Sequence, residues 1–392
     1  MWTQKKLLSV LCCLVIVTFV ACVTNYSHIF GYLAGLTKVL EGSDRISKND
    51  SIIKVSLLSS NDNLVSRLEE LISNTVVKKS EAFTNPCDKT SAACTSSCPK
   101  PLSSNPKQRL LDILSSANLT LSSRELEDIL SMAESIPESD VIILSASSSN
   151  HYNEMQAMFQ NLHSVVFPLV ENLTVVLFDI GLTREQRIKT EKNCRCKVVK
   201  FPSEKFPRHM KNNHCYSWKP VIIRATIEKS RKLLLYQDAS VRWTKGIVDG
   251  MFRATTTGMQ IFRYFGSSRI PIHTLKQTFD YFGEEPCAFD PFPEVAATLS
   301  MFRNDVFNRR AILEPWAKCA LTSECMCPVE PQSVLSCGKP VANHRCHRFD
   351  QSALGMITAK IFSNDIHRVI APDLDQNVQI KREDVAPNYF NK

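Results

Sequence analysis

The sequence predicts an α/β domain with a mostly parallel central sheet flanked by helices, preceded by a transmembrane helix and a stem. Three observations support this prediction. Short apolar runs alternate with amphipathic helical patterns from about residue 108 onward, residues 7–24 are almost wholly apolar, and a polar stretch separates the two regions. Strands that alternate with helices favour parallel pairing through right-handed crossovers.

The apolar segment at residues 7–24 carries no charge and is close to the shortest length that spans a hydrocarbon core of about 30 Å. Lys5 and Lys6 precede it, and no comparable basic cluster follows closely. The positive-inside rule therefore predicts a cytoplasmic tail at residues 1–6 and a lumenal remainder, the type II single-pass arrangement. A cleaved signal peptide, with small residues near Ala21 as the cleavage site, is the alternative.

Residues 25–107 are rich in Ser, Asn and Lys and are predicted to form a stem. A short amphipathic helix is expected within residues 57–77. Cys87, Cys94 and Cys98 lie among several prolines, a composition typical of an extended linker held by disulfides. The lumenal domain is predicted to span residues 108–392.

Four buried strands are predicted within the domain, at residues 141–144, 173–178, 197–201 and 233–236. Helices are expected between them and ahead of the first. Two of these begin with capping boxes, Ser122 with Glu125 and Thr183 with Gln186, and another opens at Trp218. After residue 246 the pattern is less regular, with strands expected near 261–265 and 297–302 and helices after residue 305 and at 350–361.

The cysteines indicate an oxidising compartment. Three of the fifteen lie in the apolar segment, and the remaining twelve form an even set, as expected for disulfides. Sequons at Asn49, Asn118 and Asn172 agree with lumenal exposure. The cysteine-rich stretch 319–346 does not have the spacing of zinc knuckles, so disulfides are expected there too.

Several classes of function are disfavoured. The net charge is +8, but Lys and Arg are spread along the chain without a basic run, so nucleic-acid binding is not indicated. The chain contains no Gly-x-Ser-x-Gly, no His-Glu-x-x-His and no Gly-x-Gly-x-x-Gly, which disfavours serine hydrolases, zincins and dinucleotide-binding folds.

The most informative stretch is 231–246, in which the apolar run 233–236 ends abruptly at Asp238. A carboxylate at the carboxyl end of a buried parallel strand lies where open α/β sheets bind ligands. Ser240 points to the same side as Asp238 if the chain stays extended, because side chains alternate along a strand. Two such oxygen ligands suit a hard divalent cation and its phosphates.

A buried strand followed by Asp-Ala-Ser (238–240) resembles the Asp-x-Asp signature of GT-A-fold glycosyltransferases, although Ser240 stands where the second acid is expected. The segment 347–354, His-Arg-Phe-Asp-Gln-Ser-Ala-Leu, is similar to the Asp-Gln segment found late in many such enzymes. The layout also resembles a nematode-expanded family of membrane-anchored proteins classed as a domain of unknown function. The resemblance covers roughly residues 140–370.

The resemblance implies a nucleotide-sugar donor whose diphosphate is bound through Mn²⁺ or Mg²⁺. Asp238 would be the first metal ligand, with Ser240 and His347 as further ligands. Asp350 would act as the general base on the acceptor hydroxyl or contact the donor sugar, and Glu294 would contact the acceptor. The alternatives are a turn cap for Asp238 and a helix N-cap for Asp350.

By the same resemblance, Ser145, Ser147 and Asp179 would line the nucleoside pocket, with Asp179 on the base or ribose. Lys219 would bind a phosphate. The alternatives are loop-forming serines and a solvated lysine.

The resulting hypothesis is a glycosyltransferase of the Golgi or endoplasmic reticulum membrane, acting on a glycan, protein or lipid acceptor. A second hypothesis is a catalytically inactive GT-A-like module that binds glycans or partners, supported by the missing second acid. A third is a secreted, disulfide-rich structural protein.

Overall fold

The computed structural model describes residues 61–73, 98–263, 268–338, 343–371 and 378–391. These residues belong to one compact unit, Ser60–Lys392. The predicted cytoplasmic tail, transmembrane segment, most of the stem, Cys87, Cys94 and the Asn49 sequon lie outside them. Among the described residues, no helix has the length and apolar character needed to cross a membrane.

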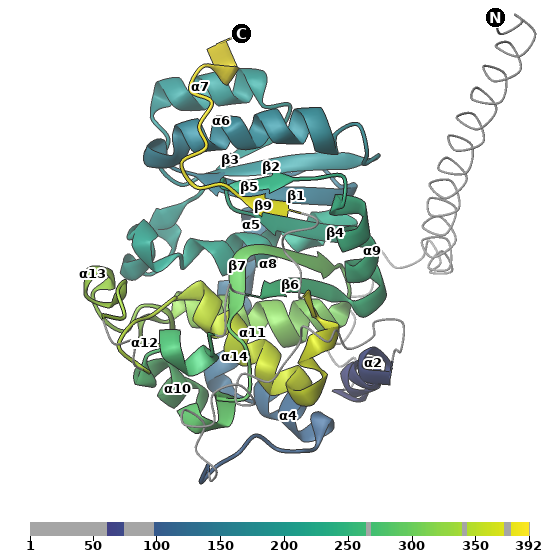
Figure 1. Ribbon diagram of the computed structural model, residues 1–392, viewed down its shortest axis with the longest axis vertical. Coiled ribbons are helices and arrows are strands. Elements are labelled where there is room, and N and C mark those ends of the chain that lie inside the picture. The colour runs from purple at the N-terminus through teal and green to yellow at the C-terminus, as the bar shows by residue number, and fades with distance from the viewer. Residues whose placement is uncertain (1–60, 74–97, 264–267, 339–342, 372–377, 392) are drawn as a thin grey trace, which may run out of the picture. The chain divides into compact units, whose positions relative to one another are not determined.

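A seven-stranded sheet forms the centre of the unit, in the order β3-β2-β1-β4-β7-β6-β8 (Figure 1). β7 is antiparallel to both of its neighbours, and the other pairs are parallel. The sheet is therefore mostly parallel, as predicted, with one reversed strand. The strands are β1 (Ser139–Ser147), β2 (Leu173–Asp179), β3 (Lys197–Lys200), β4 (Ser230–Gln237), β6 (Met259–Arg263), β7 (Val295–Arg303) and β8 (Ile370–Ala371).

The four strands predicted before residue 240 are confirmed. They form because their apolar runs are buried on both faces, which is the environment of a parallel sheet covered by helices on each side. Both predicted capping boxes are also present, at the start of α5 and of α7.

Helices cover both faces of the sheet. One face packs against α2 (Asn61–Ser73), α4 (Pro106–Leu114), α5 (Ser123–Ser131), α8 (Trp218–Thr226), α10 (Lys276–Phe282), α11 (Glu314–Leu321), α12 (Ser323–Met326), α13 (Pro331–Val334) and α14 (Asp350–Phe362). The other packs against α6 (Tyr152–Asn161), α9 (Ile247–Thr257) and a small antiparallel sheet of β5 (Val241–Trp243) with β9 (Val378–Ile380). In Figure 1, α6 and α7 (Arg184–Asn193) lie at the end of the view that holds β1–β3, and α11 and α14 near β6 and β7.

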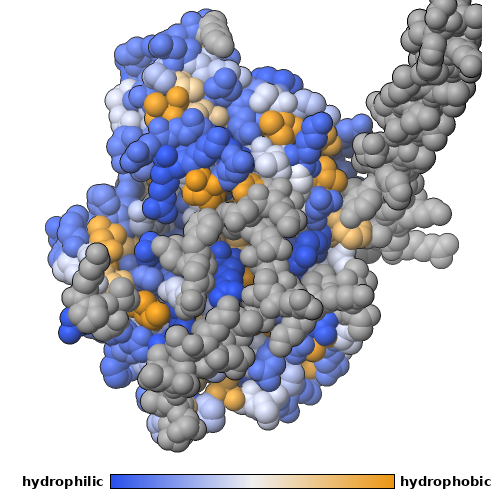
Figure 2. Space-filling model, in the orientation of Figure 1, coloured by the Kyte–Doolittle hydropathy of each residue, from blue (hydrophilic) through white to orange (hydrophobic). Residues whose placement is uncertain are grey.

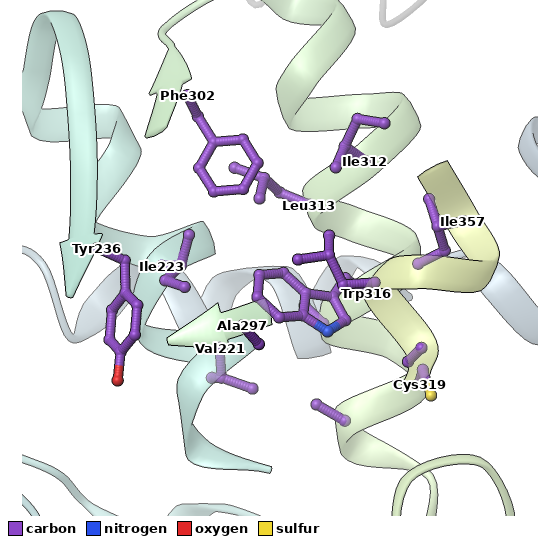
Figure 3. Packing of buried hydrophobic residues seen from close by; sticks show 14 of the residues in the cluster. Val221, Ile223, Tyr236, Ala297, Phe302, Ile312, Leu313, Trp316, Cys319 and Ile357 are labelled. Atoms are coloured by element: carbon purple, nitrogen blue, oxygen red, sulfur yellow. The ribbon is translucent and has the colours of Figure 1, made fainter. Parts of the chain in front are cut away.

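Trp316 of α11 lies at the centre of the larger apolar cluster. Figure 3 shows its indole with Ala297 of β7 and Val221 of α8 on one side and Ile357 of α14 on the other. The ring is fully buried, and its Nε1 donates a hydrogen bond to the backbone oxygen of Asp350 at 2.9 Å. This contact ties the start of α14 to the core.

Helix α2 lies within the stretch predicted to be the stem, and it packs into the same cluster through Leu64, Leu68 and Leu71. The amphipathic helix expected there is present. A disulfide between Cys98 and Cys287 also joins the end of this stretch to the domain. The compact unit therefore begins earlier in the chain than residue 108.

Helix α9 was not predicted. Its sequence contains Gly250 and ends in three threonines, residue types with low helix propensity. Packing compensates, because a Cβ at Gly250 would stand 3.0 Å from Cε of Met301 on β7, so the glycine allows the helix to lie close to the sheet.

All ten cysteines in the described part of the chain are paired. Besides Cys98–Cys287, the bonds are Cys194–Cys196, Cys215–Cys327, Cys319–Cys325 and Cys337–Cys346. The stretch 319–346 thus forms disulfides, as expected. On the face drawn in Figure 2, the coloured surface is mainly hydrophilic, and its apolar residues are in small separate groups.

Candidate active site

The carboxyl ends of β1, β2 and β4 lie at one edge of the sheet, because these strands are parallel. β2 pairs with one side of β1 and β4 with the other, so the order of strands reverses between β1 and β4. Open α/β sheets bind ligands outside the carboxyl ends of the strands at such a switch point. Ser147 ends β1, Asp179 ends β2, and Asp238 directly follows β4.

Asp238 is fixed in place and open to solvent. Its backbone N–H donates to the oxygen of Thr298 at 2.8 Å. Its Oδ1 accepts a hydrogen bond from the hydroxyl of Tyr236 at 2.6 Å, and the side chain is 33% exposed. Burial, together with the charge of Asp238, holds the pKa of Tyr236 well above its ordinary value, so the hydroxyl remains a donor.

Lys219, in the first turn of α8, joins Asp238 to Asp350. Its Nζ lies 2.8 Å from Oδ2 of Asp350 and 3.3 Å from Oδ1 of Asp238. It also donates a hydrogen bond to the backbone oxygen of Ala297 at 3.2 Å, so the ammonium has three oxygen neighbours. We call Asp238, Lys219 and Asp350 the ion triad.

The lysine of the ion triad is buried, with 4% of its side chain exposed. Burial alone would lower the pKa of Lys219, but the charges of Asp238 and Asp350 outweigh it and raise the pKa above its ordinary value. The rings of Tyr236, Tyr216 and Trp218 also surround Nζ, with centroids 5.1, 5.5 and 5.8 Å away. Aromatic faces add to the stabilisation of a buried cation.

Asp350 is the first residue of α14, and its side chain is 5% exposed. Burial raises its pKa, and the charge of Lys219 opposes the rise. The preceding residue, Phe349, has φ 48° and ψ −109°, and Tyr216 has φ 51°. Their rings lie 6.0 Å apart. Positive φ is costly for bulky residues and is concentrated at functional sites.

The turn that carries Asp238 is held by the C-terminal segment. Ser240 is nearly buried, and its backbone oxygen accepts from the N–H of Lys381 at 2.8 Å. The guanidinium of Arg242 donates to the oxygen of Ala239 at 2.5 Å and pairs with Asp384 at 2.9 Å.

His347, one of the predicted metal ligands, contacts residues other than Asp238 and Ser240. His347 is 1% exposed, accepts from the N–H of Leu275 at 3.4 Å through Nδ1, and lies against the ring of Phe349. Burial lowers the pKa of His347 to about 3. The cation position between the two acids of the triad is taken by Lys219. Of the predicted donor set, Asp238 alone is both charged and open to solvent, so an ion held by Asp350 as well would have to displace Lys219.

A second group of candidate metal ligands within the described residues consists of His273, Cys337 and Cys346. The two cysteines form a disulfide with each other, so they offer no thiolate to an ion.

Glu294 is buried and belongs to a polar network. Its Oε2 accepts from the hydroxyl of Ser268 and lies 2.6 Å from Nδ1 of His273, and its Oε1 accepts from the amide of Gln351. Since Gln351 follows Asp350, this network supports the start of α14. The contacts of His273 and Gln351 with Glu294 were not predicted, because they depend on how these segments pack.

The residues predicted for the nucleoside pocket lie at or near the same edge, and the side chains of Asp179 and Ser147 have local partners. Oδ1 of Asp179 accepts from the N–H groups of Gly181 and Leu182 at 2.9 and 2.7 Å, the geometry of a turn-forming residue. Ser147 donates to the oxygen of Ser148, and Ser145 is fully buried within β1. Oδ1 of Asp179 is thus used by the turn that follows β2.

A pocket of about 310 Å³ lies elsewhere, lined by Pro99, Pro271, Glu285, Pro286, Cys287, Asp290, Asn343 and His344. None of the predicted site residues lines it. The pocket therefore does not adjoin the ion triad through these residues. Of the triad, Asp238 is the residue that solvent reaches.

Residues 105–224 match the family described as "Protein of unknown function (DUF1647)". No curated protein matches the chain. Solved structures similar to the chain include the galactosyltransferase LgtC in complex with donor and acceptor sugar analogs, with 12% identity, TM-score 0.31, and coverage of 59% of this chain and 72% of that one.

Two further similar structures are mouse xyloside xylosyltransferase 1 (12% identity, TM-score 0.34, 60% and 84% coverage) and the mannosyltransferase Ktr4p from S. cerevisiae (10% identity, TM-score 0.33, 67% and 77% coverage). TM-scores in this range do not assign an activity to the chain.

Proposed function

We propose that the chain is a glycosyltransferase that binds a nucleotide-sugar donor outside the carboxyl ends of β1 and β4 and transfers the sugar to a glycan, protein or lipid acceptor. The ion triad at the switch point of the sheet carries this proposal. It combines an exposed carboxylate, a buried carboxylate and a buried ammonium from three distant segments.

Stability alone is a poor explanation for the triad. Removing charges from water is costly, and well-packed apolar residues in their place are often neutral or stabilising. The positive φ values of Tyr216 and Phe349 add backbone strain at the same place. A costly, strained group of charges at a ligand-binding edge is typical of a functional site.

In the proposed reaction, an acceptor oxygen bonds to the anomeric carbon of the donor, and the bond from that carbon to the diphosphate oxygen breaks. Asp350 takes the proton of the acceptor hydroxyl, since burial raises its pKa and makes it a better base. Asp238, the exposed member, orients the donor. Lys219 is a positioning residue that holds both carboxylates.

We also propose that the protein is anchored by residues 7–24 as a type II protein of the Golgi or endoplasmic reticulum membrane. The uncharged apolar segment supports the anchor. Five disulfides support an oxidising compartment.

The test is turnover of a panel of nucleotide sugars by the full-length protein in detergent. Asp238→Asn should lower the rate by about 100-fold or more, the scale on which positioned catalytic groups act. Asp249→Asn is the matched control, because Asp249 is an exposed acid on α9. The proposal fails if no nucleotide sugar is bound or hydrolysed.

A catalytically inactive module that binds glycans is the second candidate. It is favoured by Ser240, which replaces the second acid. Titration of the protein with glycans in the absence of nucleotide separates the two candidates, because an inactive module would bind the glycan and leave nucleotide sugars intact.

A further inference from the structure

We infer that this site binds the diphosphate of its ligand on cationic side chains of the protein, with Lys219 in the position between the carboxylates that a divalent cation would otherwise take. The inference rests on the proposed function and specifies how the site recognises a nucleoside diphosphate. Three features of the structure support it.

The cation position is already filled. Nζ of Lys219 lies within 3.3 Å of both carboxylates, and its third donor is used by Ala297. An ion bound by Asp238 and Asp350 together would have to displace the ammonium into a region that is nearly closed to solvent. The raised pKa of Lys219 agrees with an ammonium that keeps its charge there.

The predicted metal ligands supply a single accessible carboxylate. A Mg²⁺ ion at a diphosphate takes about six oxygen ligands, of which the protein usually supplies one or two carboxylates and water and phosphate the rest. Ser240 is neutral and nearly buried, and His347 lies against Leu275 and Phe349. Asp238 is thus the one predicted metal ligand that is both charged and open to solvent.

Exposed positive charge approaches the triad from two sides. The segment after β9 carries Lys381 and Arg382, both exposed, and the Lys381 N–H binds the oxygen of Ser240. The charge of Arg382 acts on the hydroxyl of Tyr216. After β1, His151 is 57% exposed and lies near enough to Asp238 to feel its charge.

Two of the acids beside these cations are paired elsewhere. Asp384 pairs with Arg242 at 2.9 Å, and Glu154 pairs with His151 at 3.0 Å. Glu383, next to Arg382, is exposed, so Lys381, Arg382 and Glu383 together add one net positive charge next to a triad whose own net charge is −1. A guanidinium matches the geometry of a phosphate by paired hydrogen bonds, so Arg382 is the strongest candidate for diphosphate contact.

The first experiment titrates UDP and GDP into the full-length protein in detergent, with EDTA and then with Mn²⁺. Affinity for whichever nucleotide binds should be equal within about twofold under both conditions. Arg382→Gln should weaken it by about tenfold or more, on the scale of one charge-assisted contact. Arg184→Gln, at an exposed arginine on α7, is the matched control and should bind as the wild type does. Loss of binding in EDTA overturns the inference.

The second experiment uses Mn²⁺ without nucleotide. If neither UDP nor GDP binds, that result counts against the proposed function, and the second experiment still tests the inference. Mn²⁺ by itself should leave the melting temperature of the wild type and of Lys219→Arg unchanged. It should raise that of Lys219→Gln, in which the two carboxylates lose their internal cation and become available to an ion.

Stabilisation of the wild type by Mn²⁺ overturns the inference, as does a folded Lys219→Gln variant that Mn²⁺ fails to stabilise. If Lys219→Gln does not fold, the wild type and Lys219→Arg still decide between the two outcomes.

Discussion

Acid should destabilise the fold through His347, and the size of the effect follows from its burial. The pKa of this imidazole is lowered from 6.5 to about 3 in the folded protein. As the pH falls below 6.5, the unfolded chain gains a proton that the folded protein does not bind, so the free energy of unfolding decreases. By linkage, this group contributes a loss of about 2 kcal/mol between pH 7.5 and pH 5, and about 4 kcal/mol by pH 3.

The assay is urea unfolding of the wild type and of His347→Gln at both pH values, followed by tryptophan fluorescence. The variant should lose about 2 kcal/mol less than the wild type on going from pH 7.5 to pH 5. His214→Gln, at an exposed histidine, is the control for a change of histidine content and should behave as the wild type does. Equal pH dependence in the wild type and His347→Gln would refute a neutral, buried imidazole.

Three further predictions concern stability and the role of Asp179. Replacing Cys98 and Cys287 by serine should lower the free energy of unfolding by about 2–5 kcal/mol, measured with urea, because the bond closes a separation of 189 residues. Trp316→Ala should cost about 3–5 kcal/mol in the same assay, since it empties the centre of the core. Asp179→Ala should cost about 1–3 kcal/mol by leaving two turn N–H groups without an acceptor, and Asp179→Asn should cost less.

The disulfide and Asp179 predictions each have a distinct contrary result. Removing the short-range bond Cys319–Cys325, with a separation of 6 residues, should cost less than removing Cys98–Cys287, and the reverse order would count against the loop argument. If Asp179→Asn left stability unchanged but weakened nucleotide binding, Asp179 would contact the nucleoside, as first expected, rather than form a turn.

The sheet could be predicted because its strands are encoded locally. The runs 141–144 and 233–236 are apolar at every position, so they are buried on both faces wherever they pair. The capping boxes at Ser122 and Thr183 likewise need no distant partner. In each, the two residues that exchange hydrogen bonds lie within one helical turn.

Short or weakly helical elements escaped prediction for the opposite reason. β5 and β9 have three residues each and exist because they pair with one another across a long stretch of chain. Helix α9 depends on the close approach that Gly250 permits to Met301. Neither feature leaves a local pattern in the sequence.

The individual residues of the ion triad were predicted to be functional, but their contacts with one another were not. Asp238 and Asp350 were both chosen from the segments around them, and Lys219 was expected to bind phosphate directly. Packing of α8 and α14 on one face of the sheet instead places the ammonium between the two acids. The ion-pair partner of each charged side chain depends on tertiary contacts. It could therefore not be predicted from the sequence around each residue.

This arrangement also bears on the missing second acid. In a site that relies on a divalent ion, replacing one of two carboxylates by Ser240 removes half of the charge that holds the ion and favours an inactive protein. In a site whose cation is a lysine, a second exposed carboxylate would add negative charge beside the incoming diphosphate and weaken its binding. The substitution at residue 240 therefore argues against activity only if the cation is a metal, and our inference that Lys219 takes the place of the metal removes that condition.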